Sequence, residues 1–260
     1  MNAIHRVLDP NTPAESARGF CALGVMTKAP RAGEVKTRLV PPLTPDEAAL
    51  LNACFLRDTA AAISTAIVSG KKSEKNARGV AVYTPVGWED AYADILPSDF
   101  DLLLQRGESF GERLFFAAED LFKGGFDSVC LIDSDSPTVQ SSSFAQAVEF
   151  LSSPSDQFVL GPTDDGGYYL IGLKEPHREM FEQIDWSTER VLEQTKARAK
   201  EIGLEVKLLP LCYDVDDSTA LRRLCNELLG KNSRDEIAPE TRKFLNEIIA
   251  REGRARIWPV

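Results

Sequence analysis

Short apolar runs alternate with longer helical segments along most of this sequence, and this alternation restricts the fold more than any other feature. Phe20–Thr27 (FCALGVMT) is apolar without helical spacing, which predicts a buried strand. A capping box of Thr44 and Glu47 then predicts the start of a helix that runs to about Val68. Because strands alternate with helices, we predict an α/β protein with helices on both faces of a mainly parallel, mixed sheet, a three-layer sandwich.

The same alternation continues along the rest of the chain. Further strands are expected over residues 79–84, 101–105, 128–132, 158–162, 168–173 and 205–211, and further helices over 88–96, 109–122, 142–151, 187–202, 218–229 and 239–251. The chain has 260 residues, of which 43% are hydrophobic, so it can bury one large core. We predict an N-terminal tail (1–18), one α/β domain (19–230) and a C-terminal helical appendage (231–260).

The charge and the apolar content exclude several classes of protein. The formal net charge of −10 repels phosphate backbones, which argues against nucleic acid as a partner but not against a small anionic ligand. No apolar run approaches the roughly 20 residues that span a bilayer, and the N-terminus lacks the apolar core of a signal peptide. The five cysteines are scattered and form no CxxC pair, so we expect reduced thiols in a cytoplasmic protein.

Most of the unusual polar clusters follow predicted strands. In open parallel sheets, ligands bind at the carboxyl ends of the strands, so the position of these clusters is informative. They occupy the loops over residues 28–38, 106–111, 133–138, 163–167 and 212–217.

The first of these loops is basic. Lys28, Arg31, Lys36 and Arg38 follow the first strand, and such a group of cations suits a diphosphate. An ordinary solvated basic loop explains these residues about equally well. The loop lacks the glycines of a P-loop or a dinucleotide-binding motif.

The loop after the strand 128–132 is acidic. Asp133 and Asp135 are two positions apart in an extended segment, so both carboxylates can face one ion or one ribose. A divalent cation is one interpretation, because such ions prefer carboxylate oxygens. A plain turn is the other, since Asp, Ser and Pro all favour turns.

The segment GPTDDGGYY is more unusual. Asp164 and Asp165 precede Gly166 and Gly167, which permit positive φ or a close approach to a ligand, and Tyr168 begins the next strand. Asp-Gly is also a strong hairpin signal. We expect both: a tight turn whose acids face the ligand site.

A third acidic cluster follows the last strand. Asp217 is expected to cap the next helix, which leaves Asp214 and Asp216 without a structural role. Three acidic loops at one sheet edge repel one another unless a cation or protonation relieves them. A bound metal ion is the simplest explanation.

One motif points elsewhere. Gly107–Gly111 matches the G-x-S-x-G pattern of a hydrolase nucleophile. Ser109 is explained equally by helix capping with Glu112, and His177 is the only histidine placed to act as a base. We therefore expect a cap rather than a hydrolase.

Taken in order, several motifs resemble one family. They are MTKAPRAGEVKTRL, GERLFFAAEDL, LIDSDSP, GPTDDGGYYLIGL, DWSTERVL and DVDDSTAL, which together span about residues 20–224. They resemble the DUF2064 family of proposed glycosyltransferases, also called radical-SAM/selenodomain-associated transferase 1. The resemblance implies the GT-A fold of nucleotide-diphospho-sugar transferases and kinship with guanylyltransferases.

The resemblance also implies roles for residues. Lys36 and Arg38 would face the phosphates, and Asp135 would bind the metal. Asp165, Gly166 and Gly167 match the stretch where the donor sugar or the acceptor would sit, and Asp214 and Asp216 look like a second metal-binding pair. Relatives often read GSDCP where this chain reads DSDSP, so Asp133 is not a required family residue.

These observations together predict a transferase that depends on Mg²⁺ or Mn²⁺ and transfers a sugar from a nucleotide-sugar donor to a small-molecule acceptor. Asp165, with Asp164 beside it, would orient the acceptor or act as a base. A nucleotidyltransferase that consumes a nucleoside triphosphate and a non-catalytic nucleotide-binding protein are the alternatives. The C-terminal helix is expected to cover a sheet edge or to form a homodimer contact.

Overall fold

The computed structural model describes residues 5–12, 17–71 and 76–258. Its strands are β1 (Cys21–Lys28), β2 (Ala77–Thr84), β3 (Asp101–Leu104), β4 (Ser128–Ile132), β5 (Gln157–Pro162), β6 (Tyr168–Leu173) and β7 (Glu205–Leu208). Its α-helices are α1 (Pro45–Lys71), α2 (Phe110–Lys123), α3 (Ser141–Leu151), α4 (Val191–Glu201), α5 (Ser218–Leu229) and α6 (Pro239–Glu252). Short 3-10 helices are η2 (Thr37–Leu39), η3 (Glu89–Tyr92), η4 (Arg178–Phe181) and η5 (Arg254–Arg256).

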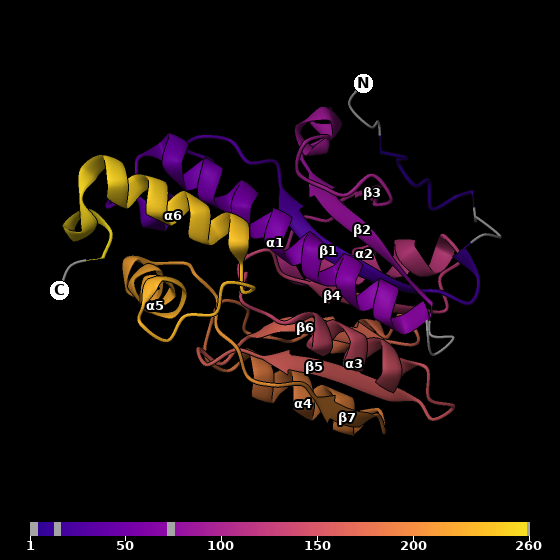
Figure 1. The fold of residues 1–260 in the computed structure, drawn as a ribbon. Coiled ribbons are helices and arrows are strands. Elements are labelled where there is room, and N and C mark those ends of the chain that lie inside the picture. The colour runs from indigo at the N-terminus through magenta and orange to yellow at the C-terminus, as the bar shows by residue number, and fades with distance from the viewer. Residues whose placement is uncertain (1–4, 13–16, 72–75, 259–260) are drawn as a thin grey trace.

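The strands form one mixed sheet in the order β3-β2-β1-β4-β6-β5-β7 (Figure 1). Neighbouring strands pair in parallel except at β6, which runs antiparallel to both β4 and β5. Because β6 runs the other way, its first residue lies at the same sheet edge as the carboxyl ends of the other strands. The turn between β5 and β6 therefore joins the loops that follow β1 and β4.

Helices cover both faces of this sheet. One core contains Leu56 and Ile63 of α1 and Phe144 of α3, and it packs on one face. A second core contains Leu121 of α2 and Ala199 of α4, and it packs on the other face. The α/β class, the three layers and the mixed sheet are thus confirmed.

Several elements differ from their predicted bounds by a few residues, and three of the differences have a clear structural form. Helix α4 begins at Val191 rather than at residue 187, because residues 186–190 form turns in which Ser187 has φ of +63°. Strand β7 ends at Leu208, three residues early, and the chain then bends toward Cys212, which bridges Thr163. The segment 88–96 forms only η3.

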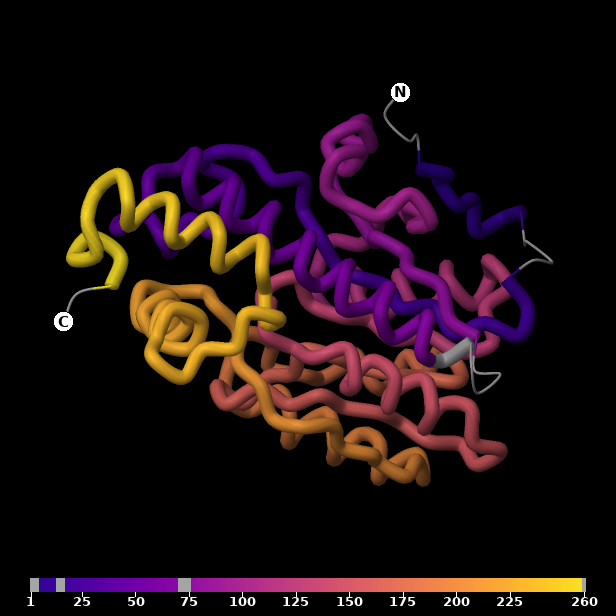
Figure 2. The backbone as a smooth tube through the Cα atoms, in the orientation of Figure 1, coloured from indigo at the N-terminus to yellow at the C-terminus, as the bar shows by residue number. Residues whose placement is uncertain are grey.

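The two terminal segments pack on the α/β layers. The backbone of residues 6–8 pairs with Leu102 of β3, and His5 is buried there. Helix α6 lies beside α1 and close to α5 (Figure 2), and the three helices share a third core that includes Phe55, Leu224 and Leu245. The predicted boundaries after residues 18 and 230 stay predictions.

One carboxylate ties the C-terminal segment to the start of α1. Glu47 completes the capping box with Thr44, and it also pairs with Arg251 and Arg256. Burial raises the pKa of Glu47, but the bonds from Arg256 and from the Thr44 backbone N–H outweigh this effect and lower it. The ionised form is therefore the one that the fold stabilises.

We expect Glu47→Gln to lower the free energy of unfolding by about 1–2 kcal/mol at pH 7, because it replaces charge-assisted bonds to a mostly buried carboxylate. A lowered pKa in the folded state gives stability above the unfolded pKa that is lost as the pH falls through the folded value. The difference from wild type should therefore shrink below about pH 4. Urea denaturation at pH 7 and below about pH 4 measures this difference in the free energy of unfolding.

Glu252→Gln is the matched control, since Glu252 pairs with the same two arginines but is 37% exposed. It should change the stability by less than about 0.5 kcal/mol. An equal loss for Glu47→Gln at both pH values would contradict this account.

Candidate active site

Three cavities lie in a row along the carboxyl edge of the sheet. The first, about 500 Å³, is lined by Lys28, Arg31, Glu34, Thr84, Pro85, Gln105, Gly107 and Arg113. The second, about 300 Å³, is lined by Lys28, Glu34, Val35, Lys36, Thr37, Arg38, Asn52, Ser134, Asp135 and Asp216. The third, about 610 Å³, shares Arg38, Ser134, Asp135 and Asp216 with the second. The shared residues make the three cavities one continuous groove.

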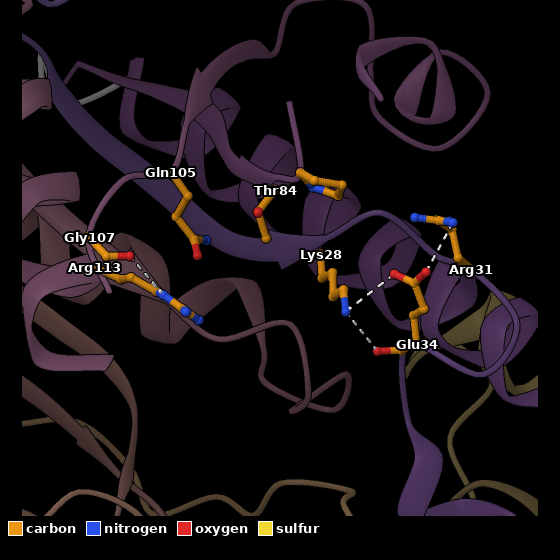
Figure 3. Close-up of a pocket in the computed structure, with 8 residues that line it drawn as sticks. Lys28, Arg31, Glu34, Thr84, Gln105, Gly107 and Arg113 are labelled. Atoms are coloured by element: carbon orange, nitrogen blue, oxygen red, sulfur yellow. Dashed lines mark hydrogen bonds and ion pairs between the residues drawn. The ribbon is translucent and has the colours of Figure 1, made fainter. Parts of the chain in front are cut away.

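The first cavity is mainly basic. Figure 3 shows Lys28 and Arg31 turned toward Glu34, with Arg113 on the opposite side. The ammonium of Lys28 lies 3.4 Å from the Glu34 carboxylate, and the Arg31 guanidinium lies 3.0 Å from it. Three cations therefore face one acid among the described lining residues. Neither Arg113 nor Gln105 was predicted from the sequence: Arg113 lies in the motif GERLFFAAEDL, to which no ligand role was assigned, and Gln105 ends a predicted strand outside any motif.

Lys36 occupies the junction between the second cavity and the acidic loops. Its Nζ lies 2.8 Å from Asp135 Oδ1 and 2.9 Å from Asp216 Oδ1, and it donates to the Val215 carbonyl oxygen at 2.8 Å. The side chain is only 4% exposed. Its backbone has φ of +48° and ψ of +36°, an unusual conformation for a residue other than glycine.

Two opposing effects act on the Lys36 ammonium. Burial lowers its pKa, but the charges and hydrogen bonds of Asp135 and Asp216 outweigh burial and raise it. Lys36 is therefore charged at neutral pH. Its left-handed backbone costs about 1–3 kcal/mol, and the ion pairs of the buried ammonium help to offset this cost.

The two acids of the 133–138 loop differ. Asp135 is 35% exposed and lines both the second and the third cavity. Asp133 accepts a 2.8 Å hydrogen bond from the Ser136 hydroxyl. Burial, and then the charge of Asp135, raise the pKa of Asp133 well above its usual range. Asp135 lines two cavities and pairs with Lys36, so it is the stronger candidate for a metal ligand.

The acids of the turn between β5 and β6 also point to different places. Asp165 accepts from the Thr163 hydroxyl at 2.6 Å and from the Gly167 N–H at 3.0 Å, and it lines the third cavity. Asp164 instead forms an ion pair with Arg223 of α5. The predicted catalytic role of Asp164 stays a prediction, and Asp165 is the acid of this turn that lines the cavity.

The same turn needs a glycine at position 166. Gly166 has φ of +90°, and a Cβ there would overlap the carbonyl oxygen of Glu189. The Gly166 carbonyl oxygen accepts from the Leu192 N–H at 2.8 Å. This close approach joins the turn to the start of α4.

We expect Gly166→Ala to lower the free energy of unfolding by about 2–4 kcal/mol, because it adds a backbone clash to an unfavourable φ. Gly203→Ala is the control. Gly203 has φ of +77° but no atom within 4 Å of the added Cβ. Gly203→Ala should therefore lower the free energy of unfolding by only about 1–2 kcal/mol. Equal losses in thermal or urea unfolding would show that the Glu189 contact is unimportant.

The loop after β7 brings the third pair of acids to the groove. Asp217 caps α5 by accepting from the N–H groups of Thr219 and Ala220, as predicted. Asp214 and Asp216 both line the third cavity. Burial, followed by the charges of Asp216 and Asp165, raises the pKa of Asp214 to about 6. The expected repulsion between the acidic loops is thus present.

An aromatic cluster forms the other side of the third cavity. The ring of Trp186 lies 5.1 Å from Phe110 and 6.4 Å from Tyr168, edge to face in both pairs. Phe110 is 51% exposed although it is large and apolar. Neither residue could be assigned a role from the sequence, because Trp186 is a single aromatic residue in a loop and Phe110 is the first residue of α2.

The hydrolase motif has the structural role expected of it. Ser109 caps α2 in a capping box with Glu112. His177 instead lies near Asp156, with 3.9 Å between Nε2 and Oδ2. Ser109 therefore serves as the predicted helix cap.

The donor atoms of this groove fit a divalent cation that binds together with a substrate. Asp135 and Asp216 already converge on one positive charge, that of Lys36. Within residues 5–12, 17–71 and 76–258, no group of three or more His, Cys, Asp or Glu residues is arranged to hold a metal ion. Two carboxylates nevertheless suit Mg²⁺, which takes its other ligands from water and substrate phosphates.

Comparison with known proteins first identifies the fold. A proposed nucleotide-diphospho-sugar transferase from Desulfovibrio desulfuricans G20 superposes with a TM-score of 0.76 and 28% identity, over 91% of this chain and 98% of the other. CMP:2-keto-3-deoxy-manno-octonic acid synthetase, in complex with CTP, has a TM-score of 0.50 and 10% identity, over 79% and 96% of the two chains, and shares the fold alone. The protein has the nucleotide-diphospho-sugar transferase fold.

A sequence match supports the same family. Residues 70–188, a little under half of the chain, match the model described as "Uncharacterized protein conserved in bacteria (DUF2064)", the family that the motifs resemble. No protein of curated function matches the sequence. Within the described part of the chain, no helix is long and apolar enough to cross a membrane.

Proposed function

We propose that the protein is a glycosyltransferase that uses a nucleotide-diphospho-sugar donor and a small-molecule acceptor. The likeness to the Desulfovibrio desulfuricans protein supports this class of reaction. The observation that carries the proposal is the continuous groove, because its basic end suits a nucleotide and its acidic end suits a sugar.

The donor would lie along the groove in one direction. The nucleoside would occupy the first cavity, near Gln105 and Arg113. The diphosphate would occupy the second cavity, where Arg38 offers planar donors and Lys36 a point charge. The sugar would then enter the third cavity beside Asp165.

Asp135 and Asp216 would hold Mg²⁺ or Mn²⁺ together with the diphosphate, with Asp214 close by. A bound cation of this kind supplies positive charge that stabilises the departing diphosphate. Lys36 would hold these two carboxylates in place before the donor arrives, since it pairs with both of them.

The chemistry then requires one proton acceptor. The acceptor's hydroxyl oxygen would bond to the anomeric carbon of the sugar while the bond from that carbon to the diphosphate breaks. The hydroxyl proton would pass to Asp165, and the nucleoside diphosphate would leave with the bonding electrons. The Thr163 hydroxyl and the Gly167 N–H hold the Asp165 carboxylate in a fixed orientation for this task.

The test is the identity of the leaving group. The protein is incubated with Mn²⁺ and with panels of nucleotide sugars and nucleoside triphosphates, and the released phosphates are separated by chromatography. We expect a nucleoside diphosphate from one nucleotide sugar, with loss of release in Asp165→Asn. Release of pyrophosphate from a triphosphate would instead identify a nucleotidyltransferase, and nucleotide binding without any release would identify a non-catalytic protein.

A further inference from the structure

The third cavity has an apolar wall and a charged wall. Phe110, which is 51% exposed, and the half-buried Trp186 form an aromatic wall, and Met26, Leu114 and Val191 also line the cavity. Aromatic surface of this kind binds a ring or another flat apolar group by stacking. A ligand that fills the cavity therefore needs an apolar face.

The charged wall is acidic. Six carboxyl groups line the cavity: Asp133, Asp135, Asp165, Glu189, Asp214 and Asp216. Lys36 pairs with Asp135 and Asp216, whereas Asp165, Glu189 and Asp214 form no ion pair within the part of the chain that the structure describes. Among the described lining residues Arg38 is the one cation, and it stands at the border with the second cavity.

We infer that the acceptor is an uncharged or positively charged small molecule in which a hydroxyl or amine stands beside an apolar ring. This inference rests on the proposed function and narrows its acceptor. The ring stacks on Trp186, and the hydroxyl or amine reaches Asp165. A phosphate or carboxylate beside Trp186, away from Arg38 and from the metal-binding pair Asp135 and Asp216, would face Asp165 and Glu189, so we expect anionic acceptors to bind more weakly.

The experiment compares three probes that share one ring and differ in charge. 2-Phenylethanol is neutral, 2-phenylethylamine is cationic and phenyl phosphate is anionic. Saturation-transfer NMR on the full chain at pH 7.5 measures each affinity. We expect dissociation constants of about 1–10 mM for the alcohol and the amine, as for other ligands of this size. Because the basic first and second cavities also suit a phosphate, phenyl phosphate is measured by its displacement of 2-phenylethylamine, which we expect to need at least about a tenfold higher concentration than displacement by the alcohol.

Substitutions at Trp186 test where the probes bind. Trp186→Ala should weaken the binding of 2-phenylethylamine at least about fivefold. Trp186→Phe should keep most of the affinity because it retains a stacking ring. Trp258→Ala is the control, since Trp258 packs against the third core near the C-terminus. Circular dichroism checks that each variant is folded.

The outcomes separate this inference from the proposed function. Displacement of the amine by phenyl phosphate as readily as by the alcohol, no binding by the alcohol or the amine, or unchanged amine binding in Trp186→Ala would each overturn the inference. Nucleotide binding is followed separately by thermal stabilisation and should not change in Trp186→Ala. If the probes behave as expected but no nucleotide binds, the donor assignment fails and the charge selectivity of the cavity stands.

Discussion

Replacing Lys36 with methionine should lower the free energy of unfolding by about 1–3 kcal/mol and abolish stabilisation by nucleoside diphosphates. Methionine keeps most of the volume but leaves Asp135 and Asp216 without their shared cation. Removing one partner of a fully buried ion pair costs about 3–5 kcal/mol of stability. We expect a smaller loss here because solvent screens Asp135 and Asp216, which are both more than a third exposed. Diphosphate binding fails because Lys36 would no longer hold Asp135 and Asp216 in place for the metal ion, and the positive charge beside the second cavity is lost.

Lys28→Met is the matched control for this variant. Lys28 lines the same second cavity, but its side chain is 45% exposed and pairs with one acid, Glu34. We expect a loss of less than about 1 kcal/mol and a weakened rather than abolished nucleotide response. Urea denaturation and thermal shifts measure both variants. If they behaved alike, the buried position of Lys36 would have no special role.

The second large effect is expected at the acidic loop after β4. Asp135→Asn should reduce transfer at least about a hundredfold and remove the dependence of nucleotide binding on Mn²⁺, because charge stabilisation by a metal ion is worth several kcal/mol. The fold should be little affected, since Lys36 keeps Asp216 as a partner. Initial rates and Mn²⁺ titrations in the presence of nucleotide measure the two losses.

Asp133→Asn provides the comparison, two residues away on the same loop. Burial and the neighbouring charge of Asp135 raise the pKa of Asp133 well above its usual range, which disfavours its charged form, and the side chain already accepts a hydrogen bond from Ser136. Asp133→Asn should therefore lower the rate of sugar transfer only several-fold. The assignment of the metal to Asp135 would be wrong if Asp133→Asn were the more damaging change.

Much of the fold could be predicted because local patterns determine it. The capping box of Ser109 and Glu112 marks the start of α2 within one residue. The boundaries that were missed depend on distant contacts. Helix α4 begins late because Gly166 packs against Glu189 and accepts from Leu192, and no local pattern shows this.

The same distinction applies to the site. The rule that ligands bind at the carboxyl ends of strands predicted that the loops 28–38, 133–138, 163–167 and 212–217 would meet, and residues from all four line the second and third cavities. The individual partners could not be predicted. Lys36 and Asp216 are 180 residues apart, and Asp164 turns away from the groove to pair with Arg223.

The most direct test of the account is thermal stabilisation of the wild-type protein by a panel of nucleoside diphosphates, triphosphates and nucleotide sugars, with and without Mn²⁺. At a hundred times the dissociation constant, a ligand adds about 2.7 kcal/mol of apparent stability, which gives a clear shift. We predict an Mn²⁺-dependent shift with one nucleoside diphosphate and its sugar, and none in Asp135→Asn. A protein that no nucleotide stabilises, with or without the metal, would contradict the proposed use of this groove.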